Sequence, residues 1–216
     1  DLHSFPTRRS SDLVVEFRRD TIDLLRQPLE EKKIAISRLE HKYVYPADFL
    51  LIAASNPCKC GYYGDEEKEC TCTASEIQKY RGKISGPVMD RIDLHIRLHN
   101  IKYDELKDRR GMSSERMRKT IVAARDLQRE RFAKLFRSEK FSLNGNLGIR
   151  QVDKVIILGK EEESFLQVAY ERYMLNPRVL FKIKKVARTI ADIAGREDVR
   201  TEDLSEAIQY REEASR

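Results

Sequence analysis

The sequence predicts a mixed fold class, an α/β part followed by an all-α part. Two observations support the α/β part. Leu50 to Ala54 form a continuous apolar run typical of a buried strand, and apolar residues alternate with polar ones in two further short stretches. A third observation supports the helical part, since from Lys102 onward the apolar residues recur only at helical spacing. We therefore expect residues 14–101 and 102–216 to form two domains.

The composition is that of a globular protein with a mild positive charge. The 216 residues are 40% hydrophobic, which is enough to bury a sizeable core. No apolar run approaches the roughly 18 to 20 residues of a membrane span, and no leader suggests secretion. The formal net charge of +6 is compatible with a polyanionic partner such as nucleic acid or nucleotide. Solvated helix faces are the simpler explanation for most of these charges.

Residues 1–13, which read DLHSFPTRRSSDL, differ from the rest of the chain. They show no hydrophobic periodicity and resemble a translated sequencing adapter. We expect them to be non-native sequence and exclude them from the fold prediction.

Residues 14–46 predict a helix followed by a β-hairpin. Apolar residues at helical spacing indicate a helix from Val14 to Gln27, which Pro28 ends. Alternating apolar residues then flank a polar turn, as in a hairpin. The alternating residues are Ile34, Ile36, Tyr43 and Tyr45, and the turn carries Arg38, His41 and Lys42. The basic side chains suit contacts with nucleic-acid phosphates, although a solvated turn explains each of them as well.

The apolar run that begins at Leu50 stops at Asn56 and Pro57. A strand ending near Ser55 places a polar amide at its carboxyl end, which is the edge where α/β sheets meet their ligands. Asn56 is therefore a candidate for orienting a phosphate or a water molecule. The alternative is an ordinary Ser-Asn-Pro turn without such a role.

All four cysteines lie in one short stretch as two Cys-x-Cys pairs, formed by Cys58, Cys60, Cys70 and Cys72. In a chain without a secretory leader, we expect a reducing compartment, the cytoplasm, and thiols or a metal site rather than disulfides. The two pairs suit a tetrahedral thiolate site for structural Zn²⁺. Common zinc ribbons use the wider Cys-x2-Cys spacing, so thiols without an ion and a disulfide or redox use stay open.

The remaining pattern predicts mostly helices. A short helix from Thr73 to Tyr80, capped by Thr73 or Ser75, precedes a helical turn at Val88 to Ile92 and a half-exposed strand at Leu94 to Leu98. Apolar spacing, caps and breaker residues then predict helices that end near Phe136, Leu158, Leu175 and Gly195, and a final helix capped by Thr201.

Two segments carry a family resemblance. SNPCKCGYYGD, followed by the second Cys-x-Cys pair, and KYRGKISGPVMDRIDLHI resemble the ComM-type, magnesium-chelatase-like branch of the AAA+ ATPases. The resemblance runs from about Glu16 to Arg211 and therefore covers nearly the whole chain. It implies that the α/β part is the C-terminal part of an AAA+ P-loop NTPase core and that the helical part is the lid domain.

The resemblance also implies roles for single residues. Asn56 would orient the attacking water, and Arg91 would be the arginine finger that one subunit inserts toward its neighbour's γ-phosphate. Without the resemblance, Arg91 reads as a surface ion pair. In the lid, Arg178 or Arg188 would sense the nucleotide's phosphates, and Arg178 is favoured by its place in the first turn of its helix. The hairpin would point into a central pore and touch nucleic acid.

The chain contains no Gly-x4-Gly-Lys-Ser/Thr loop, the motif that cradles nucleotide phosphates. The resemblance further implies an Asp-Glu pair for magnesium just before Val14, where the chain has none. We therefore expect this polypeptide to be the C-terminal part of an ATPase that binds ATP and Mg²⁺ mainly through residues outside this chain. We do not expect it to hydrolyse ATP alone.

The resulting functional hypothesis is a part of a homo-hexameric, ATP-driven motor on single-stranded or branched DNA. In the family it resembles, such motors drive branch migration during DNA uptake. One alternative is a chelatase-like ATPase that drives metal insertion into a porphyrin. A second is a non-enzymatic zinc-ribbon and helical module that binds nucleic acid.

Overall fold

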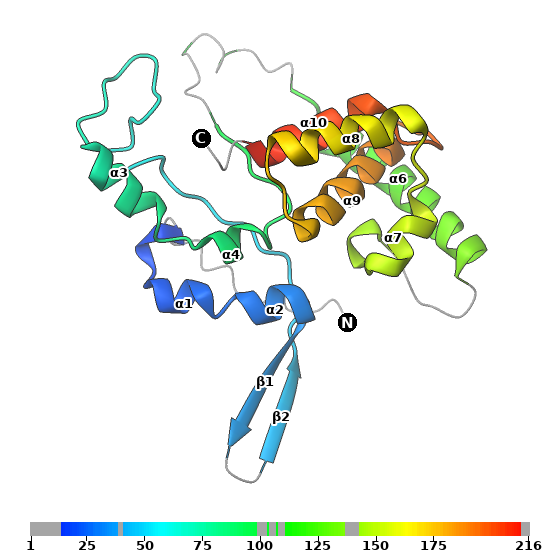
Figure 1. The fold of residues 1–216 in the computed structure, drawn as a ribbon, viewed down its shortest axis with the longest axis horizontal. Helices are drawn as coiled ribbons and strands as arrows, with labels where there is room; N and C mark the ends of the chain where they lie inside the picture. The colour runs from blue at the N-terminus through cyan, green and yellow to red at the C-terminus, as the bar shows by residue number, and fades with distance from the viewer. Residues whose placement is uncertain are drawn as a thin grey trace. The chain divides into compact units, whose positions relative to one another are not determined.

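The computed structural model describes residues 14–38, 41–98, 103, 107, 111–136 and 143–212 (Figure 1). The chain divides into two compact units, and the boundary between them lies between Ile92 and Asp93 in the sequence. The prediction of non-native sequence at residues 1–13 lies outside the described residues. Each unit is described by itself below.

Unit 1 begins with three short helical pieces rather than one helix. They are the 3-10 turn η1 (Val14–Glu16), α1 (Arg19–Asp23) and α2 (Arg26–Glu31). The prediction that Pro28 ends the helix is wrong, because Pro28 lies buried in the first turn of α2. A backbone N–H at that position has no intrahelical partner, so proline costs the helix no hydrogen bond there.

The predicted hairpin is confirmed. Strands β1 (Lys33–Arg38) and β2 (His41–Pro46) pair antiparallel, with Ile34 opposite Tyr45 and Ile36 opposite Tyr43. Figure 1 shows the hairpin extending away from α1 and α2, with α2 leading directly into β1. A backbone hydrogen bond of 2.8 Å from the Ala47 N–H to the Lys32 carbonyl closes the base of the hairpin.

Two predicted strands are wrong. Residues 50–55 and 94–98 are not in strands, and the side chains of Leu50 and Ile52 are 84% and 83% exposed. A strand needs a neighbour for its backbone groups, and within the described part of the chain β1 and β2 are the strands that pair. An apolar run alone therefore did not suffice to make a strand.

The second half of unit 1 contains α3 (Ala74–Arg81) and α4 (Gly86–Met89). The predicted cap at Thr73 is confirmed, since Thr73 and Glu76 form a reciprocal capping box. The predicted helical turn near Val88 begins at Gly86, after Ser85 at the N-cap position.

Unit 2 is helical throughout its described elements, and its predicted helices are confirmed. They are α6 (Ser114–Leu135), the 3-10 turn η2 (Asn144–Asn146), α7 (Ile149–Val155), α8 (Lys160–Arg172), α9 (Pro177–Ile193) and α10 (Thr201–Glu212). Helix α9 lies at the centre and packs against α6, α7 and α10. Asn176 caps α9 by accepting a 3.0 Å hydrogen bond from the Val179 N–H.

The core of unit 2 gathers around α9, through residues that include Ile183, Ala187 and Leu204. The seam predicted along α6 is buried from Ala124 to Phe132, and Leu135 at the C-terminal end of the helix is exposed. Phe132 is buried there, whereas Met117 and Ile121 in the first half are exposed. None of the described helices is both long enough and apolar enough to span a membrane.

Candidate functional site

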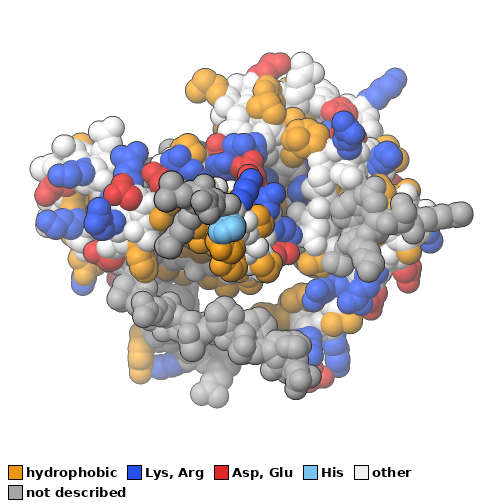
Figure 2. Space-filling model, turned by 90° about the horizontal axis from the view of Figure 1, so that it is seen from below, with side chains coloured by type: hydrophobic (Ala, Val, Ile, Leu, Met, Phe, Trp, Pro, Cys, Tyr) orange, Lys and Arg blue, Asp and Glu red, His pale blue; other side chains and the backbone are white. Residues whose placement is uncertain are grey.

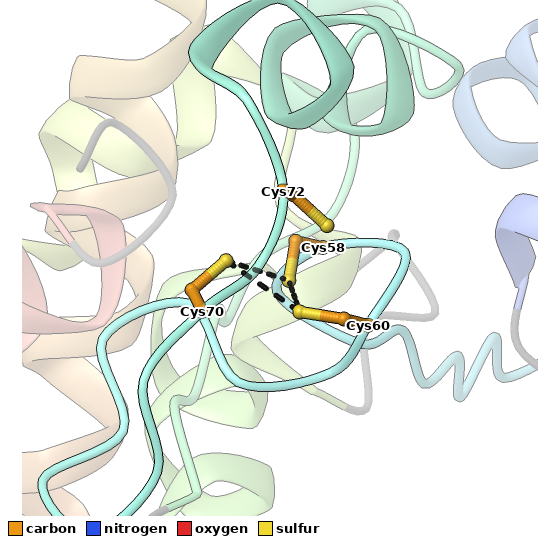
Figure 3. Close-up of side chains that lie close together, drawn as sticks. All are labelled: Cys58, Cys60, Cys70 and Cys72. Carbon is orange, nitrogen blue, oxygen red and sulfur yellow. Dashed lines mark hydrogen bonds between the residues drawn. The ribbon is translucent and has the colours of Figure 1, made fainter.

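The four cysteines converge on one point (Figure 3). The Cys58 sulfur lies 3.3 Å from that of Cys60 and 3.7 Å from that of Cys70, and the Cys60 and Cys70 sulfurs are 3.5 Å apart. The Cys72 sulfur completes the group, and all four sulfurs lie within 4.8 Å of one another. Cys58 is fully buried, and the other three cysteines are partly buried. The fold thus brings together two pairs that are ten or more residues apart in the chain.

Local turns explain how the loop between the pairs folds back. Gly61 has a φ of 88°, a left-handed conformation that glycine adopts without strain, and its N–H bonds the Cys58 carbonyl at 3.1 Å. Further along, the Asp65 carboxylate accepts hydrogen bonds from the backbone N–H groups of Glu67 and Lys68 at 2.9 and 2.8 Å. The loop ends at Cys72, directly before the Thr73 cap of α3. Helix α3 therefore anchors the second cysteine pair.

The clustered sulfurs perturb one another's protonation. The pKa of Cys60 falls to about 5, mainly because the Tyr62 backbone N–H stabilises the thiolate. The pKa of Cys70 rises to about 12. A backbone hydrogen bond from Cys72 lowers it, but burial and the neighbouring Cys60 and Cys58 sulfurs raise it further. One thiolate thus opposes the ionisation of its neighbours, and a bound cation would remove that opposition.

The donor set fits a tetrahedral metal. Zinc bound by four thiolates at about 2.3 Å requires sulfur-to-sulfur distances of about 3.8 Å, close to the 3.3 to 3.7 Å found here. A disulfide requires an S–S distance near 2.05 Å, and all four cysteines are thiols. The geometry therefore favours the predicted metal site over the disulfide alternative.

Asn56 lies two residues before Cys58, near the end of residues 47–57, which form neither a helix nor a strand. Its side chain is exposed. The segment is tied to the start of the unit by a 2.8 Å hydrogen bond from the Val14 N–H to the Ala54 carbonyl. Buried Tyr80 of α3 lies beside it. Burial raises the pKa of Tyr80, and a backbone hydrogen bond from Asn56 lowers it. Asn56 is therefore held between η1 and α3 through its backbone, which leaves its amide at the surface.

Arg91 follows α4 and forms an ion pair, as its alternative interpretation predicted, but with a partner that the sequence did not indicate. Its Nη2 donates to the Glu30 carboxylate of α2, and its Nη1 donates to the Pro87 carbonyl at 2.7 Å. The Arg91 side chain is only 14% exposed. No sequence pattern predicts this contact, because Glu30 is 61 residues away from Arg91 in the chain.

A second missed group holds the start of α4 in place. The buried Ser85 hydroxyl donates to the Asp23 carboxylate at 2.6 Å, and Arg26 donates to both, at 2.8 Å to Asp23 and 2.9 Å to Ser85. The Ser85 hydrogen bond is the main reason why the pKa of Asp23 falls below its ordinary value, although burial opposes the shift. The triad links α1 and α2 to the turn that carries Arg91.

The predicted basic residues of the hairpin lie at its far end. Arg38 and His41 are opposite one another in the register, and Lys42 follows on β2. His41 and Lys42 are exposed, whereas the side chain of Arg38 lies outside the part that the structure describes.

The two arginines predicted to sense phosphate in the helical part differ in their surroundings. Arg178 is exposed in the first turn of α9. Arg188 is 2% exposed, and it donates to the Asp192 carboxylate and to the carbonyls of Glu197 and Arg196. Because these contacts occupy the Arg188 guanidinium inside unit 2, Arg178 is the better placed of the two for an external phosphate.

Comparisons with known proteins identify the family of this chain. The family model of magnesium chelatase subunit ChlI matches residues 11–106, and the model of the C-terminal part of the same subunit matches residues 111–211. Together the two models cover most of the chain. The chain belongs to the magnesium-chelatase-like family of AAA+ ATPases. The resemblance drawn from the cysteine segment and the SGPVMDR segment is thus confirmed.

Curated members of the magnesium-chelatase-like family are similar along almost the whole chain. The competence protein ComM of Haemophilus influenzae and the uncharacterized protein YifB of Salmonella typhimurium are each 34% identical over 202 residues, or 93% of this chain. An uncharacterized protein of Mycobacterium tuberculosis is 28% identical over 205 residues. The chain spans 38% of the length of the first two relatives and 40% of the third.

Proposed function

We propose that this chain supplies the sensor asparagine, the arginine finger and the lid of a homo-hexameric, ATP-driven motor on single-stranded or branched DNA. The observation that carries the proposal is the projecting hairpin, which bears exposed His41 and Lys42 in the same unit as Asn56 and Arg91. One unit then combines groups for nucleic-acid phosphates with groups for nucleotide hydrolysis. In this proposal unit 1 is the C-terminal part of the P-loop core, and unit 2 is the lid.

In the proposed reaction, Asn56 orients the water that attacks the γ-phosphate, which its exposed amide supports. Arg91 acts in trans, since a guanidinium is always charged and stabilises developing phosphoryl charge with several donors. Its pair with Glu30 has to open before it can reach a neighbour's nucleotide. The Ser85 and Asp23 contact keeps the turn before Arg91 in place while the guanidinium changes partner.

Arg178 would couple the phosphate state to the lid. It sits in the first turn of α9, at the helix end where the macrodipole favours anions. Arg188 would serve the same helix by holding its C-terminal turn. ATP and Mg²⁺ would bind mainly through residues outside this chain, because the sequence holds no phosphate loop.

Cys58, Cys60, Cys70 and Cys72 would hold a structural Zn²⁺. A closed four-thiolate site has no open position for substrate, so the ion would stabilise the loop rather than take part in hydrolysis. The loop starts two residues after Asn56 and ends at α3, so the ion would also fix the segment that carries the asparagine.

The test is a chimera in which residues 14–212 replace the matching part of Haemophilus influenzae ComM. We expect Arg91→Ala to lower DNA-stimulated ATP turnover about 10³-fold or more while oligonucleotide binding stays intact. Arg118→Ala, in the exposed first half of α6, is the matched control and should leave turnover within twofold of the parent chimera.

The alternatives give different results in the same chimera. A chelatase-like ATPase would hydrolyse ATP but show no salt-sensitive preference for forked over duplex DNA. A non-enzymatic binding module would bind DNA without ATP turnover in any variant. Either result contradicts the motor proposal.

A further inference from the structure

Helix α2 is bonded to both ends of α4. Arg26 and Glu30 are four residues apart, so they lie on the same face of α2. Arg26 donates to the hydroxyl of Ser85, the N-cap residue of α4, at 2.9 Å. Glu30 accepts from Arg91, two residues after the end of α4. The turn that carries Arg91 is therefore held against one face of α2.

The two contacts differ in how easily they open. Ser85 is 6% exposed, and its hydroxyl also donates to Asp23, so breaking this contact would leave a buried polar group unsatisfied. The Glu30 side chain is 41% exposed, so water can replace its partner at little cost in free energy. The Ser85 end of α4 is therefore the fixed end, and the Arg91 end is the one that can be released.

Glu30 also lies close to the base of the hairpin. Lys32, two residues further on, is the C-cap residue of α2 and has a left-handed conformation with a φ of 55°. Its carbonyl accepts the Ala47 hydrogen bond that closes the hairpin, and its ammonium group pairs with Asp48 at 3.2 Å. A rotation of the hairpin about its base would thus move the end of α2 that carries Glu30. Seen end-on, the hairpin presents Lys, Arg and His side chains beside hydrophobic ones and is open to a ligand (Figure 2).

We propose that Glu30 is a positioning residue that holds Arg91 in a resting position against α2, and that movement of the hairpin releases it. The inference rests on the proposed function, in which Arg91 reaches a neighbour's nucleotide and the hairpin contacts DNA. In the resting position the Arg91 side chain is 14% exposed and donates to the Pro87 carbonyl and the Glu30 carboxylate. Donors occupied in this way do not stabilise charge on a phosphoryl group at the same time. ATP turnover would therefore stay low until DNA loads the hairpin.

The first test measures the exposure of Arg91 in the 216-residue chain, without DNA or nucleotide. Phenylglyoxal modifies accessible arginines, and mass spectrometry of the peptide that contains Arg91 gives the rate. We expect Glu30→Gln to raise this rate about two- to fivefold, which corresponds to the free energy of a partly exposed ion pair. Glu31→Gln is the matched control, because it removes the same charge from the same helix end, where Glu31 contacts Gln27 and Lys33. It should leave the rate unchanged.

The second test measures ATP turnover in the ComM chimera. We expect Glu30→Gln to raise turnover without DNA about two- to fivefold and to leave DNA-stimulated turnover unchanged. A residue with only a structural role would lower both rates together. Adding Arg91→Ala to Glu30→Gln should remove the rise, because the gain depends on Arg91. Glu30→Ala should behave as Glu30→Gln does, and Glu31→Gln should behave as the parent chimera.

Four results would overturn the inference. An unchanged modification rate in Glu30→Gln means that Glu30 does not hold Arg91 in the resting chain. A raised modification rate without a rise in DNA-free turnover means that releasing Arg91 does not control hydrolysis. An equal rise in DNA-free and DNA-stimulated turnover excludes control by the hairpin. Turnover that survives Arg91→Ala is instead a failure of the proposed function, and the inference falls with it.

Discussion

Asp192 shows how single charged residues hold unit 2 together. Its carboxylate is fully buried and accepts hydrogen bonds from Arg131 of α6, from Arg188 of its own helix and from the Asn144 amide. Burial lowers the pKa of Arg188, and the Asp192 charge opposes that shift. The network is satisfied only as a whole, because removing one member leaves buried charge without compensation.

We expect Asp192→Asn to destabilise unit 2 by about 3 to 5 kcal/mol, because Arg131 and Arg188 would remain in a buried site without their counter-charge. Urea unfolding followed by circular dichroism measures the change. Asp126→Asn breaks an exposed pair with Arg129 and should cost about 0.5 kcal/mol or less. Equal effects of the two substitutions would contradict the structural role of the network.

The Asp23 and Ser85 contact predicts a dependence on pH. A lowered pKa means that ionised Asp23 stabilises the folded state above its ordinary pKa of 3.8, and that this stability is lost as the pH falls through the lowered value. We expect Ser85→Ala to move the pKa of Asp23 back toward 3.8 and to reduce the acid-induced loss of stability. Carboxyl NMR titration measures the pKa. Exposed Ser75→Ala is the control, and an unchanged Asp23 pKa in Ser85→Ala would refute the assignment.

Capping residues next to the helices determine where α3 and α9 begin and end. Contacts with residues far away in the chain determine what the helices pack against. Thr73 and Asn176 cap α3 and α9 through side chains only three residues from the N–H groups that they accept. Gly195, with a φ of 69°, follows the end of α9. In contrast, the cysteine loop has no regular secondary structure, so the convergence of its four sulfurs is what defines its shape.

We expect the purified chain to carry one Zn²⁺, because the free energy of metal binding contributes to folding of such a loop. Cys58→Ser should abolish the bound zinc, and a chelator should lower the melting temperature of the parent chain but not that of the variant. Metal analysis after acid release measures the stoichiometry. Lys59→Ala, between the two ligands of the first pair, is the control and should keep its zinc. A metal-free chain whose melting temperature does not respond to added zinc would refute the site.

At the scale of the whole molecule, the groups proposed for hydrolysis are divided between the two units. Asn56 and Arg91 lie in unit 1, and Arg178 lies in unit 2. The sequence contains no loop of the Gly-x4-Gly-Lys-Ser/Thr type. Such a loop provides the backbone cradle and the lysine that hold the β- and γ-phosphates. The chain therefore carries the groups proposed to act on a nucleotide, but its sequence lacks this phosphate-binding loop.

We expect the 216-residue chain alone to show no ATP turnover above background. Phosphate release over hours, with and without DNA, measures it. Arg91→Ala, purified in the same way, sets the level of contaminating activity. Turnover that exceeds this level and survives further purification would contradict the prediction.

The features that could be predicted from the sequence depend on residues that are close together in the chain. Four features were predictable, because each depends on residues within a few positions of one another. They are the hairpin, the caps at Thr73 and Asn176, the succession of helices in unit 2 and the family membership. Pro28 was misread for a reason that is also local, because proline is tolerated in the first turn of a helix as well as after its end.

Contacts between residues far apart in the chain could be found only in the folded structure. No spacing rule predicts that Arg91 pairs with Glu30 or that Ser85 bonds Asp23. The burial of Arg188 could not be predicted from its position in the sequence either. The strands predicted at residues 50–55 and 94–98 failed for the same reason, because a strand is completed by its partner and not by its own composition. Short-range interactions depend on residues that are neighbours in the sequence, so the sequence predicts them. Long-range contacts form only when the chain folds and brings distant residues together.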